Sequence, residues 1–236
     1  MADKEKSVEV SEGVNPDVQA FLRKVAATPN VKPAGRRGRL LFVMDATASR
    51  EPTWDIACQI QGDMFAETAT LGGLDVQLAY FRGYREFRAT PWLSSSADLI
   101  PYMTKARCLG GHTQVERVLK YAIKETRAKK IDALVYVGDS LEESVDAVCG
   151  RAGELGMLGV PCFMFHEGGH PVVARAFQQV AQLTHGAYCA FDANSAKQLK
   201  DLLSAVAVYA AGGRKALTNY GKETGGAILQ IAHQVK

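Results

Sequence analysis

The sequence lacks paired cysteines, a long apolar run and an export signal, and each absence narrows the class of protein. Its five cysteines are dispersed without C-x-x-C spacing, and their odd number favours a reducing compartment. The longest apolar stretch late in the chain, residues 202–211, is interrupted by Ser204 and is far too short to span a membrane. The first six residues are polar, without the apolar core of an export signal. These absences predict a cytoplasmic protein with no membrane partner.

The chain also has little excess charge. Its 28 basic and 25 acidic residues leave a formal net charge of +3, which is too small to indicate a nucleic-acid partner. Arginines cluster at 36–39 and 82–88, and we interpret them as solvated loops and edges. The 236 residues are 47% hydrophobic and 22% charged, as in an ordinary soluble globular protein. This length fits one sizeable α/β domain with tails.

Apolar runs and periodic segments alternate along the chain. The expected strands are 39–44, 74–81, 86–92, 133–137, 160–165 and 187–191, and the main expected helices are 52–71, 114–129, 142–156, 171–184 and 195–211. This alternation predicts a doubly wound, mostly parallel six-stranded sheet with helices on both faces. The connection at 82–85 is so short that strands 74–81 and 86–92 must be antiparallel, which gives one antiparallel edge strand.

These elements divide the chain into three parts. Residues 1–37 form a polar extension and linker, 38–213 the folded domain, and 214–236 a C-terminal tail. Short helices are expected at 17–27 in the extension and 227–235 in the tail. The glycine pair at 212–213 is expected to end the last helix of the domain.

Oxygen-bearing side chains follow the ends of two apolar strands. Asp45, Thr47 and Ser49 leave the first strand together, and Asp139 follows the strand at 133–137. Thr113 precedes another helix, next to two glycines that allow a close backbone approach. Ligands of open parallel sheets bind beyond the carboxyl ends of the strands, so these five side chains can meet there. Carboxylates and hydroxyls are hard oxygen ligands that suit Mg²⁺ or Mn²⁺.

In this set the sequence resembles the von Willebrand factor A (VWA) domain family, over roughly residues 39–211. The family's metal-ion-dependent adhesion site begins with D-x-S-x-S, which Asp45, Thr47 and Ser49 match with threonine at the middle hydroxyl. Thr113 matches the threonine of the family's second loop, and Asp139 the aspartate of its third. Three ordered loops on the expected elements are more specific than the first motif alone.

The resemblance implies a role in recognition. Mg²⁺ or Mn²⁺ held by these residues would keep an open position for an aspartate or glutamate of a partner protein. The metal would then be a recognition element, so no enzymatic activity is expected. Intracellular, bacterial-type members of the family imply an ATPase or a chaperone-like protein as the partner.

Each residue of the set also has a purely structural interpretation. Thr113 with Glu116 has the spacing of a helix-capping box, as does Ser140 with Glu143, and Ser49 is placed to cap the helix at Pro52. Asp45 alone can bind backbone amides. A metal-free VWA scaffold therefore stays open as an alternative.

Enzymatic alternatives are less well supported by the residues. A Mg²⁺-dependent hydrolase would need a general base, for which Glu51, Glu142 and Glu143 are the only nearby candidates by sequence. A dehalogenase-type phosphatase would need an acid at position 47, where threonine cannot serve. Residues 166–170 match the zinc-protease pattern H-E-x-x-H, but two glycines within it and a following proline predict a loop between strand and helix.

Overall fold

The computed structural model describes residues 16, 19–20, 37–191 and 196–224. The helix expected at 17–27 lies almost wholly outside the described residues, and the helix expected at 227–235 lies entirely outside them. Among the helices that are described, none is long and apolar enough to cross a membrane.

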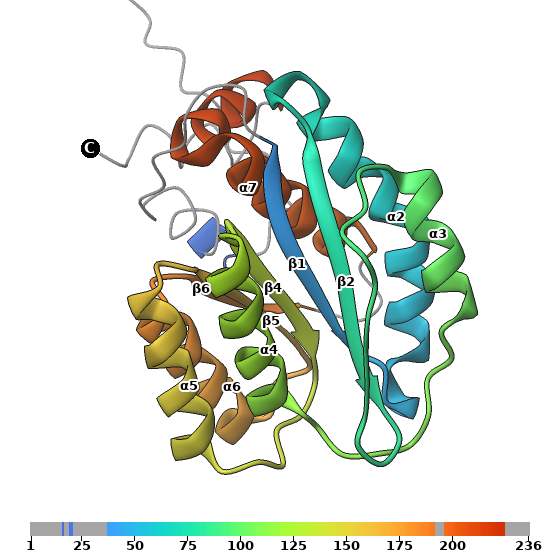
Figure 1. Cartoon of the computed structure of the whole chain (residues 1–236), viewed down its shortest axis with the longest axis vertical. Coiled ribbons are helices and arrows are strands. Elements are labelled where there is room, and N and C mark those ends of the chain that lie inside the picture. The colour runs from blue at the N-terminus through green and yellow to red at the C-terminus, as the bar shows by residue number, and fades with distance from the viewer. Residues whose placement is uncertain (1–15, 17–18, 21–36, 192–195, 225–236) are drawn as a thin grey trace, which may run out of the picture.

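Six strands form one sheet, as the sequence predicted. They are β1 (Gly38–Asp45), β2 (Leu74–Arg82), β3 (Glu86–Ala89), β4 (Ala133–Gly138), β5 (Cys162–Glu167) and β6 (Ala187–Phe191). Their order is β3-β2-β1-β4-β5-β6. Neighbouring strands are parallel except β3, which pairs antiparallel with β2 at the edge. The predicted fold class, a mostly parallel α/β sheet with one antiparallel edge strand, is confirmed (Figure 1).

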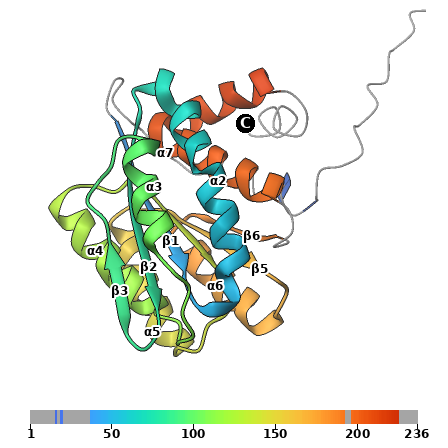
Figure 2. The same ribbon diagram turned by 90° about the vertical axis from the view of Figure 1, so that its right-hand side faces the viewer.

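Helices cover both faces of this sheet. The helices are α2 (Glu51–Thr68), α3 (Ser96–Lys105), α4 (Val115–Ala128), α5 (Val145–Met157), α6 (Pro171–Leu183) and α7 (Ala196–Thr224), with short 3₁₀ turns η1 (Ala48–Arg50) and η2 (Ala69–Leu71). One core contains buried residues of α2, α3 and α7, and the other contains those of α4, α5 and α6. Figure 2 shows α2 and α4 on opposite sides of the strands.

The central strand β1 is buried along its whole length. Leu40, Phe42 and Met44 enter the core under α2 and α7, whereas Leu41 and Val43 enter the core under α4 and α5. Alternate side chains of a strand point to opposite faces, so a strand covered on both sides reads as a continuous apolar run. Because this run is buried along its whole length, Asp45, the last residue of β1, is also buried.

Some element boundaries differ from the sequence prediction. The third strand ends at Ala89 instead of residue 92, and Pro91, which has no N–H to give to a ladder, follows it. α5 begins at Val145 instead of residue 142, because Ser144 caps it by accepting a bond from the N–H of Ala147 (3.5 Å). The expected Ser140–Glu143 capping box is therefore wrong.

The glycine pair interrupts the last helix, as predicted, and a second helical segment follows it. Gly213 has non-helical angles (φ 69°, ψ −166°), and the helical segment then continues to Thr224. Beyond the bend, Ala216 is buried and Tyr220 packs against the core. Glycine can adopt this positive φ, and burial of the apolar residues beyond it holds the second segment against the domain.

Candidate metal centre

The winding of the sheet reverses between β1 and β4. From β1 the chain moves outward through β2 to β3, and it then returns to β4 and continues to β5 and β6. Asp45 is the last residue of β1, and Asp139 comes directly after β4, its neighbour in the sheet. The parallel strands β1 and β4 end at the same edge of the sheet (Figure 1), so the two aspartates stand at the point where open α/β sheets bind ligands.

Asp45 is a buried carboxylate, and only one of its two oxygens has a hydrogen-bond partner among the described residues. Its exposure is 1%, and its Oδ1 accepts a hydrogen bond from the N–H of Thr47 (2.8 Å). Its Oδ2 is buried and has no hydrogen-bond partner among the described residues. Burial raises the pKa of Asp45 to about 6, and the charge of Asp139 adds to this effect, against the bonds from Thr47 and the charge of Arg50.

The two hydroxyls of the first loop lie beside Asp139. Ser49 Oγ donates to Asp139 Oδ2 (2.9 Å), and Thr47 Oγ1 is 3.5 Å from Ser49 Oγ. The N-cap position of α2 is Arg50, without a side-chain capping bond, so the interpretation of Ser49 as a helix cap is wrong. The structure thus brings Asp45, Thr47, Ser49 and Asp139 into one polar cluster.

Thr113 is fastened to the loop that follows Asp139. Its Oγ1 accepts a bond from the N–H of Glu142 (2.9 Å), and its own N–H donates to Glu142 Oε2 (3.2 Å). The capping-box interpretation of Thr113 and Glu116 is also wrong. Glu143 caps α4 instead, because its carboxylate accepts from the N–H groups of Val115 (2.5 Å) and Glu116 (2.8 Å).

The loop before Thr113 is held close to the first loop and to the β2–β3 turn. The N–H of Leu109 donates to the carbonyl of Ala46 (3.0 Å), and the N–H of Gly83 donates to the carbonyl of Leu109 (3.3 Å). A Cβ on Gly111 would lie 2.0 Å from the carbonyl oxygen of Gly83, whereas a Cβ on Gly110 would meet nothing within 4 Å. The expected close approach of backbone therefore concerns Gly111 alone.

Sequence reasoning missed a buried cation beside the cluster. Arg50 is 2% exposed, forms an ion pair with Glu167, and places Nη1 3.6 Å from Asp139 Oδ2. Thr53 donates to the same Glu167 carboxylate and accepts a bond from Arg50 Nη2 (3.1 Å). Arg50 follows the D-x-T-x-S motif directly, but no sequence pattern links it to a glutamate on β5.

The H-E-x-x-H segment does not form a zinc site. His166 is a fully buried residue of β5 whose Nδ1 lies 2.9 Å from the hydroxyl of Tyr188. Glu167 pairs with Arg50, and His170 lies at the N-cap of α6, after a glycine at φ 85°. The pattern spans a strand end, a turn and a helix start, as expected, so the two histidines do not share a helical face.

The donor chemistry of the cluster fits a hard divalent cation. Within the described part of the chain, no group of three or more His, Cys, Asp or Glu side chains is placed to hold a metal ion. The candidate centre is of another kind, since it has only two carboxylates and its remaining donors are hydroxyls. All of these donors are oxygens, and the buried, unpartnered Oδ2 of Asp45 is the atom that a cation would satisfy.

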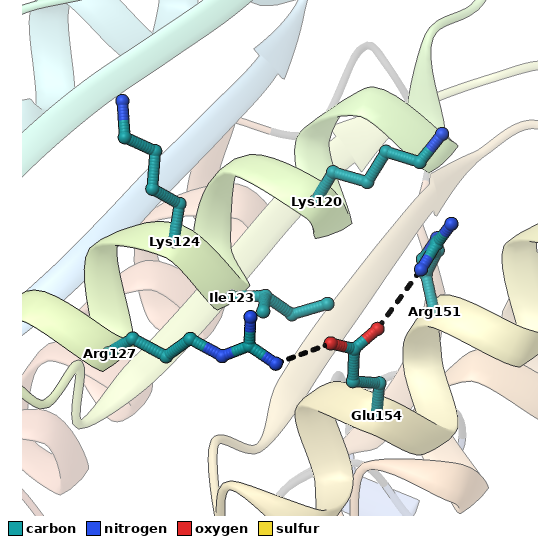
Figure 3. A pocket seen from close by; sticks show the side chains of 6 residues that line it. All are labelled: Lys120, Ile123, Lys124, Arg127, Arg151 and Glu154. Atoms are coloured by element: carbon teal, nitrogen blue, oxygen red, sulfur yellow. Dashed lines mark hydrogen bonds and ion pairs between the residues drawn. The ribbon is translucent and has the colours of Figure 1, made fainter.

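A hollow of about 340 Å³ lies between α4 and α5, away from the candidate centre (Figure 3). Glu154 binds Arg127 Nη2 (2.8 Å) and Arg151 Nη1 (3.1 Å), and Lys120 pairs with Glu116 (2.7 Å). The Arg127–Glu154 pair links α4 to α5, whereas the other two pairs lie within one helix, and exposed pairs of this kind contribute little to stability. We interpret the hollow as a solvated charged face.

No protein-family model matches the sequence, and no curated protein matches it. Solved structures do match. The VWA domain of SpRpn10 aligns with a TM-score of 0.54 at 11% identity, over 71% of this chain and 94% of that one. Proximal thread matrix protein 1 from the mussel byssus, in a form with a zinc-occupied MIDAS motif, aligns with a TM-score of 0.56 at 16% identity, over 75% and 47%.

The pilus adhesin SpaC from Lactobacillus rhamnosus GG aligns with a TM-score of 0.58 at 13% identity. The match covers 82% of this chain but 31% of the adhesin, so this chain corresponds to less than a third of that protein. Identities this low establish the fold alone. Together with the strand order, they show that the chain has the fold of a VWA domain.

Proposed function

We propose that this chain, a VWA fold, is a protein-binding module whose candidate metal centre holds Mg²⁺ or Mn²⁺ and accepts a carboxylate from a partner protein. The observation that carries the proposal is the buried, unpartnered Oδ2 of Asp45 beside the Ser49–Asp139 hydrogen bond, at the switch point of the sheet. A buried carboxylate oxygen without a partner is costly, and a cation would remove that cost.

In this proposal Asp45, Thr47, Ser49, Thr113 and Asp139 hold the cation directly or through water. The cation supplies a positive charge and an open coordination position for an aspartate or glutamate. Among the described residues, Arg50 pairs with Glu167 and lies 3.6 Å from Asp139, and Glu142 holds the loop of Thr113 in place. The solved VWA neighbour with a zinc-occupied MIDAS motif supports a divalent cation at this position.

The cellular setting belongs to the same proposal. We place the protein in the bacterial cytoplasm, in a complex with an ATPase or a chaperone-like protein. The dispersed cysteines, which lack C-x-x-C spacing, support this setting. An acidic surface on the partner is expected, because the metal takes a carboxylate.

A metal-free scaffold is the second candidate, and one observation favours it. The guanidinium of Arg50 already lies 3.6 Å from Asp139, where it supplies part of the positive charge that a metal would supply. The hydrolase has less support, because two of its three candidate bases are engaged elsewhere. Glu142 accepts from Thr113 and contacts His112, and Glu143 caps α4.

The test is calorimetric titration of Mg²⁺ and Mn²⁺ into the wild type and Asp45→Ala. We expect one saturable site in the wild type that Asp45→Ala abolishes. Asp146→Ala is the matched control, because Asp146 is an exposed aspartate in the first turn of α5. If neither the wild type nor the control binds millimolar metal, the chain is a metal-free scaffold. Turnover of a phosphoester lost in Glu142→Ala would support the hydrolase.

A further inference from the structure

We propose that a rim patch, made of Tyr84, Leu109 and His112, selects partners that carry a large apolar residue next to the metal-binding carboxylate. This inference rests on the proposed function, because the patch is useful only if a partner binds at the candidate metal centre. It specifies the chemistry of that partner, which carries an apolar side chain beside its carboxylate.

The rim patch exposes apolar surface. Tyr84 is 77% exposed and Leu109 47% exposed. The side chain of His112 is 71% exposed, and its ring lies 6.4 Å from the ring of Tyr84 in an edge-to-face arrangement. Exposed aromatic and aliphatic side chains that adjoin a polar site are typical of protein-binding surfaces.

The backbone holds the rim patch against the metal-site loops. The N–H of Leu109 is bonded to the carbonyl of Ala46, the residue between Asp45 and Thr47 (3.0 Å). Gly83, which precedes Tyr84, donates to the carbonyl of Leu109 (3.3 Å). His112 directly precedes Thr113. The patch is therefore joined, by these backbone bonds and by the chain itself, to the loops that carry three of the five candidate ligands.

The charges around the rim patch favour an acidic partner. The guanidinium of Arg85 lies 5.4 Å from the ring centre of Tyr84. At the other end of the patch, the carboxylate of Glu142 lies 2.8 Å from Nδ1 of His112. The cation at the Tyr84 end attracts an acidic residue of a bound segment, and the carboxylate at the His112 end repels one, so the two charges fix the direction of that segment. The partner is therefore an acidic protein segment in which a carboxylate is followed by a leucine-like side chain.

The test uses NMR titration of the ¹⁵N-labelled full chain with three hexapeptides in Mg²⁺. They contain a central aspartate–leucine, aspartate–serine or asparagine–leucine pair and are otherwise identical. We expect the aspartate–leucine peptide to bind about tenfold more tightly than aspartate–serine, since covering part of two apolar side chains contributes on the order of 1.4 kcal/mol. The asparagine peptide should not bind.

Two double variants, one in the rim patch and one on α3, replace the same kinds of side chain. Tyr84→Ser with Leu109→Ser removes the patch, and Tyr102→Ser with Ile100→Ser removes a tyrosine and an aliphatic residue of α3 that are 42% and 41% exposed. We expect the leucine preference to vanish in the first pair and to persist in the second. All four side chains are exposed, so both variants should keep the wild-type thermal midpoint.

The outcomes separate the two proposals. Mg²⁺-dependent binding of both aspartate peptides with equal affinity, or loss of the preference in both variants, would overturn the rim patch and leave the proposed function standing. No Mg²⁺-dependent binding of any peptide would count against the proposed function itself. Dimerisation in Mg²⁺ that the rim-patch substitutions abolish, seen by sedimentation, would assign the patch to a second copy of this chain and overturn the acidic segment.

Discussion

Replacing Asp45 with asparagine should make the metal-free protein more stable at neutral pH. Asparagine keeps an oxygen for the N–H of Thr47 but removes the charge from a residue that is 1% exposed. Most substitutions of buried polar residues destabilise a protein, so a gain in stability is a specific consequence of an ionised carboxylate held in the core without a cation.

The magnitude follows from the pKa of Asp45, which burial raises from 3.8 to about 6. Two pKa units correspond to about 3 kcal/mol of unfolding free energy at neutral pH. A carboxyl group whose folded-state pKa is raised stabilises the protein fully below its unfolded pKa, and this contribution is lost as the pH rises through the folded-state value. Between about pH 5 and pH 7.5, the wild type should therefore lose about 1.4 kcal/mol that Asp45→Asn does not lose.

Urea unfolding in EDTA, followed by circular dichroism at both pH values, measures this difference. Addition of saturating Mg²⁺ should reverse the order, because a metal at 1,000 times its Kd stabilises the wild type by about 4.1 kcal/mol and cannot bind the variant. Asp146→Asn is the control and should change neither the pH dependence nor the response to Mg²⁺. If Asp45→Asn destabilises the protein equally at both pH values, Asp45 is an ordinary structural acceptor and the reasoning is refuted.

Substitutions at three places test the surroundings of the centre. Arg50→Gln should strengthen Mg²⁺ binding by about tenfold and Glu167→Gln should weaken it, since the two substitutions change the local charge in opposite directions. The double variant should bind Mg²⁺ like the wild type. Weaker calorimetric binding in both single variants would show that the pair acts only as a structural support. Gly111→Ala should lower the unfolding free energy by about 1–3 kcal/mol, because its Cβ would lie 2.0 Å from the carbonyl oxygen of Gly83, whereas Gly110→Ala, with open space around it, should be nearly neutral in the same urea titration. Glu143→Ala should cost about 1–3 kcal/mol by leaving two N–H groups of α4 uncapped, and an unchanged urea midpoint would contradict this role.

The fold could be predicted because its signals are local. The apolar run of β1, buried on both faces, and the three-residue connection between β2 and β3 determine strand placement and the antiparallel edge. The meeting of Asp45 with Asp139 then follows from topology, since parallel neighbours end at the same edge of a sheet.

The contacts that the sequence did not reveal are long-range. The ion pair of Arg50 joins η1 to the end of β5, and no periodicity or spacing encodes that pairing. Glu143 stands one residue before the cap of its own helix, yet it caps α4, which precedes it in the chain. The pattern Ser140-x-x-Glu143 fitted a local rule, but tertiary contact gave the carboxylate more N–H donors than its own helix did.

The most direct test of the metal centre is an anomalous-difference map from crystals grown in MnCl₂. We predict a peak bordered by oxygens of Asp45, Ser49, Thr113 and Asp139, at the edge of the sheet between β1 and β4. A map without a peak there, with the guanidinium of Arg50 bound to both aspartates, would contradict the account and identify the chain as a metal-free scaffold.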